Sequence, residues 1–71
     1  MTPIRRVAAH EVVTPERVFA PGVVELEAGR VVDVYSLVGE QASTEWLGGV
    51  ITVENGDDRQ PKAYYKGKPI K

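Results

Sequence analysis

Cysteine is absent from the 71 residues of this chain. Its absence excludes disulfides, thiolate zinc sites and cysteine nucleophiles. A chain of this length buries only about 60% of the surface that its unfolded form exposes, so we expect modest stability. The fold must depend on packing, on hydrogen-bond ladders and on contacts with a partner subunit where one is present. We therefore predict a single domain that spans residues 1–71.

Long apolar stretches are also absent, and none approaches the length needed to cross a bilayer. Arg5 and Arg6 lie near the start, but no apolar run follows them, so we expect no signal peptide and no membrane association. A cytoplasmic location is the default expectation. The apolar fraction of 42% is that of a globular domain and too high for a disordered chain of net charge −1.

Uninterrupted segments of helical length are scarce, because glycine or proline recurs along the whole chain. Valine occurs twelve times, and β-branched side chains suit a pleated sheet better than a helix. We predict an all-β fold, a small sandwich or partly open barrel of five or six short, mostly antiparallel strands. The expected strands cover Ile4–Val13, the two arms of a hairpin from Gly22 to Ser36, Thr44–Leu47, Val50–Glu54 and Lys62–Lys66.

The hairpin from Gly22 to Ser36 is the clearest unit. Its arms are residues 23–27 and 30–35, joined by the two-residue loop Ala28-Gly29, in which the glycine supplies the positive φ of a primed turn. This register places Glu27 opposite Arg30. Leu26 then faces Val31 and begins an apolar patch.

Two runs of the sequence resemble a known family. PGVVELEAGRVVDV, from Pro21 to Val34, is similar to the opening hairpin of metal-dependent amidohydrolases of the dihydroorotase and imidazolonepropionase kinds. TEWLGGVI, from Thr44 to Ile51, resembles the segment that follows in those enzymes, and the likeness covers about residues 4–54. In that family these strands form a small N-terminal β-sandwich beside a TIM barrel, and the barrel holds the metals.

The chain departs from the family pattern after Gly49, where the enzymes continue into Pro-Gly and a His-x-His metal motif. Here Val50–Gly56 follows instead, and the remaining residues are too few for a barrel. The resemblance therefore implies a free-standing relative of the β-sandwich module that lacks the barrel and has no hydrolase activity. We expect no enzyme and no cofactor.

Candidate chemical groups each have a simpler structural interpretation. His10 is the only histidine and a metal site needs several converging donors, so we expect it to pack or to meet solvent. Glu25 and Glu27 share a strand face and could flank a scissile bond or hold a hard cation, but a half-exposed strand gives the same pattern.

Other residue combinations do not form a recognisable motif. No nucleophile-elbow sequence accompanies the triad-type residues Ser36, Ser43, His10 and Asp33. Asn55–Asp58 lacks the remaining ligands of a calcium loop, and Gly48-Gly49 is not followed by the Gly-Lys-Ser/Thr of a phosphate loop. We predict no catalytic, cofactor-binding or metal-binding residue.

Charge is distributed unevenly, since all ten acidic residues precede Arg59 and the five basic residues from Arg59 onward face no acid in sequence. On a strand, Lys62, Tyr64 and Lys66 would share a face that could contact single-stranded nucleic acid. The net charge of −1 argues against this, and lysines that protect an edge strand give the same pattern.

The sole tryptophan, Trp46, is either a core anchor or an interface residue. Our leading hypothesis is a non-enzymatic structural or protein-interaction module that self-associates as a homo-oligomer or binds another protein. Its expected contact residues are Trp46, Leu47, Tyr64 and Tyr65. Two alternatives stay open: binding of single-stranded nucleic acid through the basic C-terminal strand, and service as an accessory subunit of an amidohydrolase.

Overall fold

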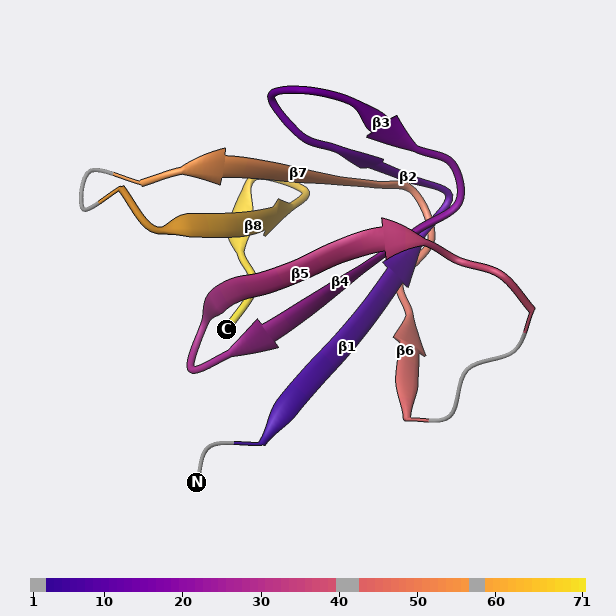
Figure 1. Cartoon of the computed structure of the whole chain (residues 1–71), viewed down its shortest axis with the longest axis horizontal. Coiled ribbons are helices and arrows are strands. Elements are labelled where there is room, and N and C mark those ends of the chain that lie inside the picture. The colour runs from indigo at the N-terminus through magenta and orange to yellow at the C-terminus, as the bar shows by residue number, and fades with distance from the viewer. Residues whose placement is uncertain (1–2, 40–42, 57–58) are drawn as a thin grey trace.

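The computed structural model describes residues 3–39, 43–56 and 59–71, and these form an all-β sandwich (Figure 1). No helix occurs within these ranges, and hence none that is long and apolar enough to cross a membrane. The nine strands are β1 (Ile4–Ala9), β2 (Glu11–Val13), β3 (Val18–Phe19), β4 (Gly22–Glu27), β5 (Arg30–Ser36), β6 (Thr44–Trp46), β7 (Val50–Asn55), β8 (Pro61–Tyr65) and β9 (Lys68–Pro69). The predicted fold class is confirmed, with shorter and more numerous strands than expected.

Two mixed sheets make up the sandwich. Sheet A has the order β5-β4-β1-β6, and sheet B has the order β3-β2-β7-β8-β9. Most neighbours are antiparallel, but β1 pairs with β6 and β2 with β7 in parallel. β2 follows β1 directly in the chain, and β7 follows β6. Each of these two segments therefore contributes one strand to sheet A and the next strand to sheet B.

The segment Ile4–Val13 was expected to be one strand, and this expectation is wrong at its centre. It bends at His10, so that β1 belongs to sheet A and β2 to sheet B. The later segment bends in the same way at residues 47–49, between β6 and β7. Within β1 the side chains alternate as in a regular strand, since Val7 and Ala9 join the core cluster and Ala8 does not. Beyond the bend Val12 is the core residue, and not Glu11.

The predicted hairpin is confirmed as β4 and β5. Leu26 lies opposite Val31, Glu27 lies opposite Arg30, and the turn residues have φ of 54° at Ala28 and 79° at Gly29. The register shifts between Glu25 and Leu26, which leaves Val32 as an extra residue in β5. This bulge was not foreseen from the sequence.

At the C-terminal end the expected strand Lys62–Lys66 stops one residue early. β8 ends at Tyr65, and Lys66-Gly67 forms a second two-residue turn with φ of 53° and 79° that leads into β9. Lys66 therefore does not continue the face of Lys62 and Tyr64. β3, of only two residues, is also missing from the sequence-based prediction.

Valine and other aliphatic side chains fill the space between the sheets. The largest fully buried members of the core cluster are Leu26, Ile51, Val7, Val12 and Val24, and no polar or charged residue is buried within the described ranges. Each large aliphatic side chain that leaves water stabilises the fold by about 1.5–3 kcal/mol. The core therefore depends on small interlocking side chains and on the close approach of the two sheets.

Candidate functional site

The corner where the bent strands pass from one sheet to the other is built around His10. Its Nδ1 accepts a hydrogen bond of 3.0 Å from the Gly49 amide, and the Gly49 carbonyl accepts one of 3.1 Å from the Glu11 amide. Gly48 and Gly49 have φ of 72° and 64°, a conformation that glycine adopts without a steric penalty. His10 is thus a structural acceptor at the corner.

Trp46 lies beside this corner on the solvent side. Its ring meets the His10 ring edge to face, with centroids 4.9 Å apart and planes at 79°. The residue is nevertheless 55% exposed. An indole held against another ring but open to solvent is a typical anchor for a protein partner, since it buries a large area with little loss of conformational freedom.

A row of side chains crosses the outer face of sheet A at the level of Trp46. Cα pairing places Trp46 beside Ala8, Ala8 beside Val23, and Val23 beside Tyr35. These four side chains point away from the core, because their strand neighbours Val7 and Val24 belong to the core cluster. We call this row, together with Arg6 and Glu25 in the adjoining row, the Trp46 face.

Ala8 and Val23 are almost fully buried although they belong to the outer side of the sheet. Tyr35 is half-buried and Trp46 exposed. The two small central residues of the row are therefore covered, and the two aromatic residues stand at its ends.

The adjoining row carries a charged network. Glu25 Oε2 accepts hydrogen bonds from Arg6 Nε at 3.0 Å and from the Tyr35 hydroxyl at 2.6 Å. The Tyr35 hydroxyl and then the Arg6 guanidinium hold the pKa of Glu25 below its usual value. The same carboxylate raises the pKa of Tyr35 and that of Arg6. Glu25 therefore stays ionised, and its charge is matched by Arg6.

The two glutamates that share a face are both paired. Glu25 is held as described, and a carboxylate oxygen of Glu27 lies 3.5 Å from Arg30 Nη2. Within the described ranges no group of three or more histidine, cysteine, aspartate or glutamate side chains is placed to hold a metal ion. The half-exposed-face interpretation of Glu25 and Glu27 agrees with this geometry.

The four expected contact residues do not form one surface. Only Trp46 belongs to the Trp46 face. Leu47 and Tyr65 pack against the core, where the Tyr65 hydroxyl donates a hydrogen bond of 2.7 Å to the Leu47 carbonyl. Tyr64 lies opposite Thr52 in sheet B. The sequence does not show which of these four residues lie on the same surface, because that depends on the sheet to which each strand belongs.

The basic residues of the proposed nucleic-acid surface are also divided. Lys62 and Tyr64 are on β8, whereas Lys66 is in the following turn with its Nζ 5.5 Å from the centroid of the Tyr65 ring. That cation–π contact directs the Lys66 amine toward the aromatic ring. The expected face of three residues is therefore reduced to two.

Comparison with known proteins supports the resemblance that the sequence indicated. No family model matches the chain, and no curated protein matches it. A solved structure of N-acetyl-D-glucosamine-6-phosphate deacetylase from Mycobacterium smegmatis, in complex with N-acetyl-D-glucosamine-6-phosphate, is similar to it with a TM-score of 0.57 and 28% identity. The match covers 75% of this chain but only 14% of the deacetylase. The chain thus resembles a small β module of an amidohydrolase.

Proposed function

We propose that this chain is a non-catalytic β-sandwich module that packs against the catalytic body of an amidohydrolase-type enzyme. The observation that carries the proposal is the match in which most of this chain corresponds to a minor part of a deacetylase. In that protein a fold of this kind is joined to a much larger remainder. A module with a small core gains stability from such a neighbour.

The Trp46 face is the surface that we assign to this contact. It offers one exposed aromatic anchor and a half-buried tyrosine whose hydroxyl already has an acceptor in Glu25. Its Arg6–Glu25 ion pair is complete, so a partner can cover it without leaving a single buried charge. An interface core of this composition is typical of stable protein contacts.

The strand edges are less suited to association. Three of the four edge strands, β3, β6 and β9, have only two or three residues each. The fourth edge strand, β5, is interrupted by the bulge at Val32. Short or bulged edges disfavour strand addition. Packing of a sheet face, by an enzyme or by a second copy, is therefore the expected mode of contact.

Co-expression tests this proposal. The chain is produced with each amidohydrolase-type protein of its own organism, and complexes are separated by size exclusion. Trp46→Ser should weaken the complex at least thirtyfold, as expected for a hot spot of about 2 kcal/mol. Val18→Ser is the matched control, since Val18 is also 55% exposed but lies on sheet B.

Circular dichroism of both variants establishes that they are folded before binding is compared. Absence of any complex, or a complex equally sensitive to both substitutions, contradicts the assignment. A concentration-dependent dimer of the isolated chain that Trp46→Ser abolishes would identify a second copy as the partner of this face.

A further inference from the structure

A hollow of about 420 Å³ lies between the edges of the two sheets. Its walls include β5, the edge strand of sheet A, and the turn at residues 14–17 that leads into β3, the edge strand of sheet B. The floor comes from the core residues Val31 and Val53, with the partly buried Phe19 and Val34 beside them. We call this hollow the edge groove. Its described lining includes no residue of the Trp46 face.

Val32 lines the exposed side of the edge groove. It is the extra residue of the bulge in β5 and is 47% exposed, although Val31 next to it belongs to the core. The bulge disfavours addition of a further strand to β5, because it interrupts the row of free backbone groups. The valine side chain still offers apolar surface that a partner can cover through side chains alone.

The walls of the edge groove carry charges of both signs. Arg17 lies on the turn, with its guanidinium carbon 5.6 Å from the centroid of the Phe19 ring, and Asp33 lies on β5. Neither belongs to an ion pair among the residues that the structure describes. Asp33 Oδ1 accepts a hydrogen bond of 2.9 Å from the Val34 amide. Glu16, beside Arg17, is the third charged residue of the lining.

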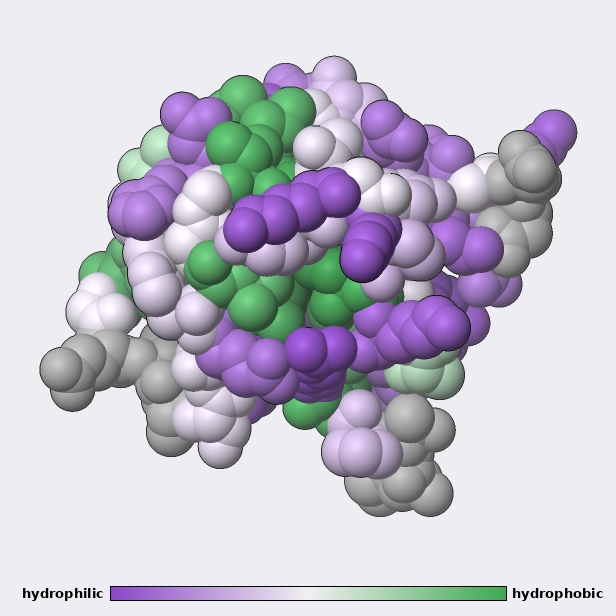
Figure 2. All heavy atoms as spheres, turned by 180° about the vertical axis from the view of Figure 1, so that it is seen from behind, coloured by the Kyte–Doolittle hydropathy of each residue, from purple (hydrophilic) through white to green (hydrophobic). Residues whose placement is uncertain are grey.

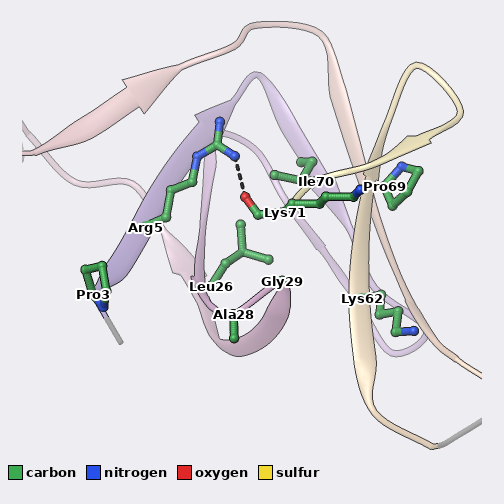
Figure 3. A pocket seen from close by; sticks show the side chains of 9 residues that line it. All are labelled: Pro3, Arg5, Leu26, Ala28, Gly29, Lys62, Pro69, Ile70 and Lys71. Atoms are coloured by element: carbon green, nitrogen blue, oxygen red, sulfur yellow. Dashed lines mark hydrogen bonds between the residues drawn. The ribbon is translucent and has the colours of Figure 1, made fainter. Parts of the chain in front are cut away.

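The hollow beside the β4–β5 turn is different in this respect (Figure 3). It measures about 650 Å³, but its Arg5 guanidinium is bound by Glu45 and by the main-chain oxygen of Lys71, and Lys62 is engaged within the chain. Apolar exposure alone does not mark a site either, since Figure 2 shows apolar residues open between hydrophilic ones. The edge groove is distinguished by charges of both signs beside an apolar floor.

We propose that the edge groove is the contact surface of a two-fold dimer of this chain. A two-fold axis brings the same surface of both copies together, so each contact between two different positions occurs twice. Arg17 of each copy faces Asp33 of the other, and Val32 of each copy covers the apolar floor of the other. A second copy supplies both signs of charge, whereas a strongly basic or acidic partner would place like charges together at one wall.

Sedimentation equilibrium of the full chain at low salt tests this proposal. A contact centred on one groove lies at the low end of interface sizes, so we expect a dissociation constant of roughly 10 µM to 1 mM. Arg17→Asp and Asp33→Arg should each weaken the dimer about tenfold or more, because each reversal places like charges together twice. An equimolar mixture of the two variants should regain a dimer, since opposite charges then face each other at both positions.

A pair of valine variants tests the apolar part of the contact. Val32→Ser should weaken the dimer about fivefold or more, because the contact is lost twice in each dimer. Val50→Ser is the matched control, since Val50 is 46% exposed but lies on β7 outside the edge groove. Circular dichroism establishes that every variant is folded before association is compared.

Four results would each overturn the proposal. They are a parent chain that stays monomeric at the highest concentration, a mixture of the two reversal variants that regains no dimer, equal effects of Val32→Ser and Val50→Ser, and a dimer that Trp46→Ser abolishes. The enzyme complex is measured separately, because the Trp46 face and the edge groove share no residue. Failure of one proposal therefore leaves the other standing.

Discussion

Gly22→Ala tests the close approach of the two sheets. Gly22 is buried at the start of β4, where it pairs with Ala9 and Ser36. A Cβ at this position would lie 2.7 Å from Val12 Cγ2, 2.8 Å from Val12 Cβ and 2.9 Å from Phe19 Cβ. Two of these neighbours are β-carbons, which cannot move without their backbone. The sheets must therefore separate, or β4 must shift, to accept one methyl group.

The expected cost is large for a domain of this size. Overpacking of a close-packed interior costs about 1–3 kcal/mol, and three contacts below the usual limit place Gly22→Ala at about 3 kcal/mol. Small domains lose about 4–8 °C of Tm for each kcal/mol, so the Tm should fall by roughly 12–24 °C. Against a total stability of about 5 kcal/mol, this is more than half.

Urea unfolding followed by circular dichroism measures this cost, and Gly39→Ala is its control. A Cβ on Gly39 would meet no atom of the described residues within 4 Å, but its φ of 68° makes an alanine there strained by about 1 kcal/mol. The control therefore measures backbone strain without a clash. If Gly22→Ala loses no more stability than Gly39→Ala, the argument that Val12 and Phe19 exclude a side chain is refuted.

Three further predictions concern the Trp46 face, the corner and the turn. Because the pKa of Glu25 is lowered in the fold, its contribution to stability is present above its unfolded pKa of about 4.5 and is lost as pH falls through the lowered value; Glu25→Gln should flatten this acid-limb decline in urea midpoints. His10→Ala should destabilise by about 1–2 kcal/mol and speed hydrogen exchange of the Gly49 amide, which loses its acceptor; unchanged exchange would contradict the corner role. Ala28→Asn should stabilise by about 0.5 kcal/mol in the same unfolding assay, because asparagine suits the positive φ; a loss of stability would contradict this.

The sequence was most informative where the structure is local. The β4–β5 hairpin was predicted with its turn and with the Glu27–Arg30 and Leu26–Val31 pairs, because a two-residue loop fixes the register of its arms. The bulge at Val32 escaped prediction. Alternation after the turn gives no sign of where an extra residue is inserted.

A sandwich was among the predicted folds, but the points at which the chain passes from one sheet to the other were not predicted from the sequence. Continued alternation from Val7 and Ala9 would put Glu11 in the core, so the pattern does change at His10, but this change alone does not show that the strand passes to another sheet there. The reason is a long-range pairing: the Gly49 amide binds His10, which is 39 positions away. The same limit applies to Trp46 and Tyr64, which were grouped by residue type and lie on different sheets.

The glycines in the two runs that resemble amidohydrolases now have physical explanations. Gly22 lies where no Cβ fits between the sheets, Gly29 completes the β4–β5 turn, and Gly48-Gly49 forms the corner at which the chain changes sheets. All of these positions specify how the backbone folds and packs. None of them supplies a reacting group. The residues that carry the resemblance therefore account for the architecture of the module. The specific role of this chain must depend on its surface side chains, beginning with Trp46.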